Sequence, residues 1–298
     1  MLTDAHCHFF SSRFLELLSE PIPDLPVEAR AVVVATKLGW THSGDPAALA
    51  ATWIAELDRH SVSRAALIAS IPGDEPSVAE AVHLYPDRFV GFFMFNPAAP
   101  GAEEKLERAF TEHRLRCVCL FPALHRYRLD DASVAAVFQS AARHRAAVFV
   151  HCGVLSVGVR AKLGLPSPFD LRLGDPLALA SVAGGYPSVP VIVPHFGAGR
   201  FQEALMAADQ CASIHFDTSS SNGWMKYYPG LTLDTVFRQT LGVVGPRRLL
   251  FGTDSSFFPR GWQRPVFDAQ LAAMIAIGVS AADRELILAG NFNRLFST

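Results

Sequence analysis

The stretch LTDAHCHF (2–9) places two histidines, His6 and His8, one residue apart near the start of the chain. We predict that this stretch is the first of a series of short β-strands, which are mostly apolar along the chain, as strands buried on both faces are. In a strand, residues two apart point the same way, so His6 and His8 share one face and Cys7 takes the other. Asp4 lies on the histidine face, about 6–7 Å further back along the strand, and we expect it to accept hydrogen bonds inside the core.

Seven further apolar runs follow, and a helical pattern comes after each of them. The eight strand candidates are 2–9, 64–70, 89–96, 116–121, 147–152, 189–195, 213–219 and 248–254. The helix candidates are 47–60, 77–85, 102–113, 134–145, a segment after Pro176, 200–210, 232–241, 265–277 and 281–296. Eight strand–helix units predict an α/β fold, the (β/α)8 TIM barrel, and we treat residues 1–298 as one domain. A doubly wound open sheet is the alternative, but no GxGxxG motif follows the first strand.

Several helix starts carry local signals. Asp45 and Asp175 each precede a proline, which predicts an N-cap followed by the first helical residue. Ser133 is expected to cap the helix that follows it. The segment 20–46 is longer than a normal loop and contains a strand-like run, AVVVATK (31–37). We therefore expect an elaborated loop after strand 1, lying over the barrel mouth.

The composition argues against several classes of partner. The net charge is -2 and 18% of the residues are charged, without a long run of either sign, which disfavours a nucleic-acid or anionic-membrane surface. The longest apolar stretches, such as VGFFMF (90–95), are too short to span a bilayer. The five cysteines include no CxxC pair, and we expect no signal peptide because the first strand is predicted to start at Leu2. These features predict free thiols in the cytoplasm, and the low charge content is compatible with a buried contact in a homodimer.

Residue types that bind metal ions stand at the ends of three later strands. His151 ends strand 5, His195 ends strand 6 and Asp254 ends strand 8. The C-terminal ends of all strands in a barrel converge on one mouth, where the active site lies. The three side chains are therefore expected to meet His6 and His8 there. Imidazole nitrogens with one carboxylate form a suitable ligand set for zinc or another divalent transition metal.

Five motifs spread over the whole chain resemble the amidohydrolase superfamily. They are most similar to the amidohydrolase-related branch that contains aminocarboxymuconate-semialdehyde decarboxylase, aromatic-acid decarboxylases and small lactonases. The motifs are DAHCH (4–8), FVHCG (149–153), PHFGAG (194–199), LFGTDSSF (250–257) and GNFNRLF (290–296). The motifs at strand 1 and strand 8 together are the most specific part of the resemblance.

The resemblance implies a metal site and a role for each residue in it. One divalent ion, zinc first and manganese as the alternative, would be held by His6, His8, His151 and Asp254. His195 would lie beside the metal-activated water as an acid/base or electrostatic helper, and Asp254 would also take part in proton transfer. Binuclear relatives carry a bridging lysine or glutamate at the end of strand 4, where this chain has Phe121–Pro122. We therefore expect one metal ion per chain.

Loops after the strands supply candidates for substrate binding. An arginine there would suit a substrate carboxylate, and a tryptophan would suit an aromatic ring. The candidates are Arg160, Arg200, Trp40, Trp224 and Trp262, and for each of them an ordinary loop role is the alternative. The segment SSFFPRGW (255–262) follows Asp254 and matches neither the hydrolases nor the decarboxylases of the resembled branch.

Three functions are compatible with this pattern. The first is a metal-dependent hydrolase that uses a metal-activated water on a C–O or C–N bond of a small, anionic, cyclic or aromatic substrate. The second is a metal-dependent non-oxidative decarboxylase of an aromatic or unsaturated acid. The third is a barrel that binds metal without catalysis, which would require a damaged site, and no expected ligand is missing. We favour the hydrolase over the decarboxylase, which shares the same ligands.

Overall fold

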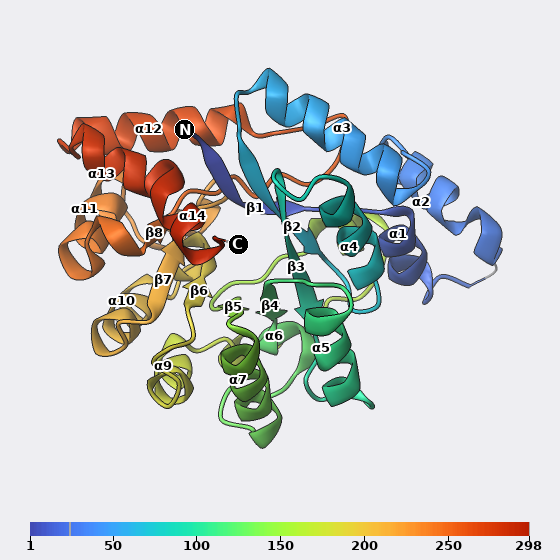
Figure 1. Ribbon diagram of the computed structural model, residues 1–298, viewed down its shortest axis with the longest axis horizontal. Coiled ribbons are helices and arrows are strands. Elements are labelled where there is room, and N and C mark those ends of the chain that lie inside the picture. Colours follow the sequence, from blue (N-terminus) through green and yellow to red (C-terminus); the bar gives the residue numbers. More distant parts are fainter. Residues whose placement is uncertain (24, 298) are drawn as a thin grey trace.

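Eight parallel strands pair in chain order, each with the next, and helices surround them (Figure 1). The computed structural model describes residues 1–23 and 25–297. The strands are β1 (Thr3–His8), β2 (Arg64–Ala69), β3 (Phe89–Phe95), β4 (Cys117–Leu120), β5 (Ala147–Val150), β6 (Val191–Val193), β7 (Ile214–Asp217) and β8 (Leu249–Leu250). Each observed strand lies inside its predicted range, so the prediction of a (β/α)8 TIM barrel is confirmed.

The barrel closes between β1 and the segment that begins with β8. Backbone hydrogen bonds run from Ala5 N to Phe251 O at 2.8 Å and from Asp254 N to His6 O at 3.0 Å. Cys7 and Ser255 form an isolated parallel bridge just beyond β8. The first ten residues and the segment around residue 254 therefore share one rim of the barrel.

The outer ring of helices also follows the sequence prediction. Its members are α3 (Pro46–Arg59), α4 (Glu75–Leu84), α5 (Ala102–Thr111), α7 (Ala132–His144), α9 (Pro176–Gly184), α10 (Phe201–Gln210), α11 (Leu233–Val244) and α12 (Arg264–Ala276). The chain ends with α13 (Ala281–Glu285), a π-helical turn over Leu286–Gly290, and α14 (Asn291–Leu295). None of the helices in the part of the chain that the structure describes combines the length and apolarity needed to cross a bilayer.

The predicted helix caps are confirmed at two of three positions. The side chain of Asp45 accepts a hydrogen bond from Ala48 N, and that of Asp175 accepts one from Leu177 N. The prediction for Ser133 is wrong, because α7 already begins at Ala132 and its N-cap is Asp131. Ser133 lies inside the first turn, where it cannot take the N-cap position.

The elaborated loop after β1 is present, but its strand-like run is a helix. The segment folds into α1 (Ser12–Ser19) and α2 (Arg30–Leu38), and AVVVATK (31–37) lies inside α2. The strands of the barrel pair with one another and offer this run no free edge. Its buried residues recur instead at helical spacing and pack against α1 and α8 (Gly158–Lys162). These buried residues are Ala31, Val34, Ala35 and Leu38.

Apolar side chains fill the barrel interior below the mouth. Phe92 of β3, Phe149 of β5 and Leu250 of β8 belong to one buried cluster, and Phe292 and Phe296 near the C-terminus join it. The ring centroids of Phe92 and Phe296 are 5.1 Å apart. The interior below the mouth is therefore a packed core and not an open channel.

A buried carboxylate fastens the start of α1 to the loop before α4. Asp74 is fully buried and accepts a hydrogen bond from Ser11 Oγ at 2.7 Å. Burial raises the pKa of Asp74 to about 7, although the hydroxyls of Ser77 and Ser11 oppose the shift. Among nearby charges, Glu75 raises this pKa and Arg13 lowers it.

We expect Asp74→Asn to become more stable relative to the wild type as the pH rises. The unfolded chain releases this proton near pH 4, whereas the folded chain retains it until the pH approaches about 7. Between about pH 4 and about pH 7 the folded wild type holds a proton that the unfolded chain has released. The free energy of unfolding of the wild type therefore falls as the pH rises through this range. Urea unfolding at about pH 4.5 and about pH 7.5 measures the effect, which is a few kcal/mol at most. Asp209→Asn, at an exposed position of α10, is the control, and parallel pH profiles for Asp74→Asn and wild type would contradict the assignment.

Candidate metal centre

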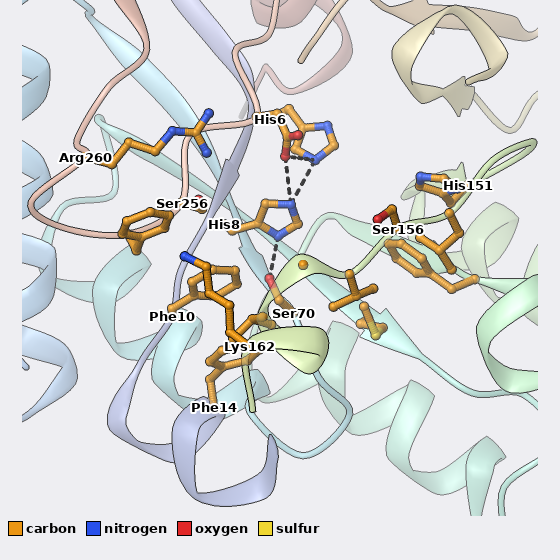
Figure 2. A pocket seen from close by; sticks show the side chains of 18 of the residues that line it. His6, His8, Phe10, Phe14, Ser70, His151, Ser156, Lys162, Ser256 and Arg260 are labelled. Carbon is orange, nitrogen blue, oxygen red and sulfur yellow. Dashed lines mark hydrogen bonds and ion pairs between the residues drawn. The ribbon is translucent and has the colours of Figure 1, made fainter. Parts of the chain in front are cut away.

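Three side-chain atoms from the two ends of the chain converge at the barrel mouth (Figure 2). His6 Nε2 and His8 Nε2 are 3.3 Å apart. Asp254 Oδ1 lies 3.0 Å from His8 Nε2 and 3.6 Å from His6 Nε2. These three atoms form a group of metal-ligand type. The strand period places both imidazoles on one face, as predicted, and the closure of the barrel brings Asp254 to them.

Hydrogen bonds at Nδ1 fix the tautomer and the orientation of both imidazole rings. His6 Nδ1 donates to Asp217 Oδ2 at 2.6 Å, at the end of β7. His8 Nδ1 lies 2.6 Å from Ser70 Oγ. Ser70 Oγ donates its own proton to the Ile68 carbonyl, so it accepts from His8 Nδ1–H. Both Nε2 atoms are then unprotonated in the neutral rings and point their lone pairs at the shared space, the arrangement that metal-binding histidines use.

The charges around this group also suit a cation. Burial alone would lower the pKa of His6, but the carboxylates of Asp217, Asp254 and Asp4 together outweigh it and raise the pKa to about 8. Burial opposes ionisation of Asp254, yet its hydrogen bond with His8 and the charges of His6 and His8 hold its pKa well below the usual range. The three carboxylates thus draw positive charge to His6, and a divalent ion bound there would replace a proton on that ring. The residues present therefore fit a metal ion.

Asp254 is held in an uncommon backbone conformation by its neighbours. Its φ is 61°, in the left-handed region that side chains other than glycine seldom adopt. The preceding residue, Thr253, donates from Oγ1 to Asp4 Oδ2 at 2.5 Å and from its backbone N to Asp4 Oδ1 at 3.1 Å. Asp4 is thus a hydrogen-bond partner in the core, as the sequence indicated, and it supports the turn that carries Asp254.

His195 stands on a left-handed turn at the end of β6. His195, Phe196 and Ala198 have φ values of 55°, 53° and 44°, and Gly197 between them has 87°. The turn packs against Gly153 so closely that a Cβ there would lie 2.3 Å from Gly197 O. Glycine at position 153 therefore lets the loops after β5 and β6 approach each other, which turns the His195 ring toward the mouth.

The His195 ring lies beside the converging group. Its centroid is 5.1 Å from that of His6 and 5.4 Å from that of His151. Ser219 holds its Nδ1, with the hydroxyl oxygen at 2.9 Å and the carbonyl oxygen at 3.2 Å. This contact leaves Nε2 as the ring nitrogen available to a substrate or a water molecule.

His151 lines the same cavity but is not one of the three converging donors. Its ring stacks on Phe121 with centroids 5.3 Å apart. Its Nδ1 is buried and has no hydrogen-bond partner among the described residues. A buried imidazole nitrogen without a partner is unusual, and a metal ion would provide one.

A cavity of about 330 Å3 opens from the histidines toward the loops. Parallel aromatic rings form one side of it. Phe10 stacks on Trp40 with ring centroids 5.1 Å apart, and Trp40 stacks on Phe257 at 4.6 Å. Phe10 also stacks on Phe14 of α1 at 4.2 Å. The elaborated loop after β1 therefore supplies a wall of the cavity, which is small enough to select a small organic molecule.

Only one of the five predicted substrate-binding residues lines this cavity, and it is Trp40. Arg160 turns away, because its guanidinium donates to the Pro166 carbonyl at 2.6 and 2.9 Å. Arg200 lies off the cavity wall, with Nη1 3.8 Å from Glu203 one helical turn along. In both arginines, partners close in the sequence decide the direction of the side chain.

The other two tryptophans are buried behind the cavity wall. Trp224 Nε1 donates to Asn222 Oδ1 at 3.0 Å, and the indole packs against Phe201. Trp262 Nε1 donates to Asp4 Oδ2 at 2.7 Å. Neither lines the cavity, and the acceptors that hold their indole N–H groups, Asn222 and Asp4, are themselves buried.

The structure also places at the site several residues that are outside the predicted set of ligands and substrate-binding residues. Phe10, Lys162 and Arg260 line the cavity, and Ser70 and Asp217 orient the two histidines. The sequence could have indicated Arg260, because it lies six residues after Asp254, in the segment that matches neither the hydrolases nor the decarboxylases. The roles of Ser70 and Asp217 depend on contacts across strands, for which the sequence holds no local sign.

Solved structures of similar fold cover almost the whole chain. A 5-carboxyvanillate decarboxylase from Sphingomonas paucimobilis aligns with a TM-score of 0.66 at 15% identity, covering 99% of this chain and 98% of that one. A probable 2-pyrone-4,6-dicarboxylic acid hydrolase from Acinetobacter baumannii gives 0.63 at 15%, covering 100% and 99%. A dihydroxybenzoic acid decarboxylase from Polaromonas sp. JS666, with bound manganese and 2-nitroresorcinol, gives 0.61 at 17%, covering 99% and 96%.

At these identities the likeness shows a shared fold. None of the curated proteins matches the chain. The family model described as Amidohydrolase, however, matches residues 3–298. The match includes every motif on which the resemblance rested, from DAHCH (4–8) to GNFNRLF (290–296), and the chain therefore belongs to the amidohydrolase family.

Proposed function

We propose that the protein is a metal-dependent hydrolase that cleaves a C–O or C–N bond in a small cyclic or aromatic substrate with an anionic group. The observation that carries this proposal is the convergence of His6 Nε2, His8 Nε2 and Asp254 Oδ1 in the wall of a cavity. Membership of the amidohydrolase family supports it. The protein acts as a single barrel domain on a small molecule, and not on a nucleic acid or a membrane.

One divalent ion would be held by His6, His8 and Asp254, with His151 as the fourth ligand through its unpartnered nitrogen. Zinc suits this set of imidazoles and one carboxylate best, with manganese next. When bound, the ion lowers the pKa of water toward neutrality and polarises a carbonyl oxygen. The side chain at the end of β4 that lines the cavity is Phe121, which cannot ligate a second ion.

The remaining residues position groups and move protons. Asp254 offers a second carboxylate oxygen that can accept a proton from water and return it to the leaving group. His195, held at Nδ1 by Ser219, can exchange a proton at Nε2 or donate to a developing oxyanion. Asp217 keeps the ring of His6 in one tautomer and orientation.

A second function, the non-oxidative decarboxylation of an aromatic or unsaturated acid, uses the same residues. Two observations favour it: the cavity wall is built from parallel aromatic rings, and two of the structures with this fold are named as decarboxylases of aromatic acids. In a decarboxylase the scissile carboxylate lies at the metal, and a protein group must supply a proton to the carbon that loses CO2.

The proposed cellular setting is the cytoplasm, where thiols stay reduced. All five cysteines are buried and free, which supports this placement. Pairing of two copies as a homodimer stays a prediction.

We expect one equivalent of divalent metal per chain in gently purified protein, measured by elemental analysis. His6→Ala and His8→Ala should abolish tight binding, because each removes a ligand. Asp217→Asn should weaken metal affinity by about 10–100-fold, since it only disturbs the orientation of His6. His83→Ala, on α4 away from the mouth, is the control. Two equivalents per chain, or none after reconstitution, would contradict a mononuclear site.

His195→Ala should retain the metal ion and lose about 100–10,000-fold in kcat, the usual contribution of a positioned acid or base. Cys152→Ser should keep near-normal activity, because Cys152 lies in the core cluster outside the barrel lumen. Metal content and kcat measured on the same preparations separate the two effects. A fully active His195→Ala, or an inactive Cys152→Ser that still holds metal, would refute the assigned orientation.

The reaction type follows from what the metallated enzyme releases. We expect acid release from a panel of lactones and aryl amides, followed by pH-stat, and no CO2 from a panel of hydroxybenzoates. CO2 production without net hydrolysis would replace the hydrolase with the decarboxylase. Failure to turn over either panel would remove the substrate proposal and leave the metal site to be judged by metal content.

A further inference from the structure

The segment SSFFPRGW (255–262) forms a loop between β8 and α12 that is fastened to the barrel at both ends. Near its start, Ser255 Oγ accepts from Gln263 N at 2.9 Å and lies 2.5 Å from Thr253 Oγ1. At its end, Trp262 donates from Nε1 to Asp4 Oδ2 at 2.7 Å and from its backbone N to Glu56 Oε1 at 2.8 Å. The buried carboxylates of Asp4 and Glu56 thus hold the end of the loop on its core side.

Between these anchors the loop presents three side chains to the cavity: Ser256, Phe257 and Arg260. Phe257 stacks on Trp40, and the Arg260 guanidinium carbon lies 5.8 Å from the centroid of the Phe257 ring. A backbone hydrogen bond from Thr41 N to Phe258 O, 2.8 Å long, ties the loop to the segment after α2. The backbone of the loop is therefore held on both sides of the mouth, and the exposed side chain of Arg260 lies over the Phe257 ring.

The charges that line the cavity are unequal. Lys162, at the end of α8, reaches the same cavity as Arg260 from a different loop (Figure 2). Within residues 1–23 and 25–297, no carboxylate forms an ion pair with either of them. The carboxylate that lines the cavity, Asp254, is engaged by His8. Two cations thus face the cavity without an anionic partner.

We propose that the loop 255–262 is the element that selects the substrate, and that Arg260, assisted by Lys162, binds a carboxylate on it. The carboxylate lies at the loop side of the cavity, so that the substrate ring packs beside Phe257 and Trp40 and its reacting bond faces His6 and His8. This inference rests on the proposed function for the position of the reacting bond. The binding of the carboxylate itself requires no turnover.

The test compares benzoate with benzamide, a neutral probe of the same shape, by titration calorimetry of the metallated protein. The wild type should bind benzoate at least about tenfold more tightly than benzamide, because only benzoate makes charge-assisted hydrogen bonds. Arg260→Gln should weaken benzoate binding by about 10–100-fold and leave benzamide binding unchanged. Lys162→Gln should cause a smaller loss in the same direction.

Two variants serve as matched controls. Arg160→Gln removes the arginine that the sequence favoured, and Arg264→Gln removes a surface arginine paired with Asp268; neither should change benzoate affinity. Equal affinity of Arg260→Gln and wild type for benzoate, or no benzoate binding by the wild type, would overturn the inference. Selective loss in Arg260→Gln together with an enzyme that hydrolyses nothing would uphold the inference and refute only the proposed function.

Discussion

The geometry of the site depends on the hydrogen bonds that the buried carboxylate of Asp4 accepts. It accepts hydrogen bonds from His6 N, from Thr253 through both its backbone and its hydroxyl, and from Trp262 Nε1. Burial raises the pKa of Asp4 to about 6, against the effect of these donors. A carboxylate is tolerated in such a place only when its oxygens are satisfied. Asp4 and Thr253 are 249 residues apart in sequence, so this contact joins β1 to the segment after β8 and helps to bring Asp254 to the histidines.

The positions of the metal-ligand candidates were predictable because they follow from two simple periods. The strand repeat puts His6 and His8 on one face, and the barrel brings every strand end to one rim. The partners of those histidines were not predictable in the same way. Asp217 and Ser70 meet His6 and His8 from 211 and 62 residues away, and the pairing depends on neighbouring strands and side-chain direction, which no local pattern specifies.

Where the structure departs from the expected position of a segment or side chain, the cause is the local environment of that segment. AVVVATK (31–37) has the β-branched residues of a strand, yet it has no strand edge to join and packs as a helix on α1. Arg160 lies in a loop at the mouth as predicted, but the Pro166 carbonyl lies within reach and takes its guanidinium. The Arg260 guanidinium lies over the Phe257 ring instead, and this side chain lines the cavity. Sequence placed these residues at the rim, and short-range contacts decided which of them face inward.

Negatively and positively charged side chains therefore lie at opposite ends of the cavity. Asp217 and Asp254 surround the histidines at one end, while Lys162 and Arg260 approach from the loops. An anionic substrate of the proposed kind would be repelled by these carboxylates until a metal ion neutralised them, and it would be attracted to the loop side of the cavity. Such a field would orient the substrate before the reacting bond makes any contact, and orientation of this kind is a large part of what an active site contributes. A metal ion held by the histidines and Asp254 would thus supply the chemistry and also remove the repulsion that keeps an anionic substrate from entering fully.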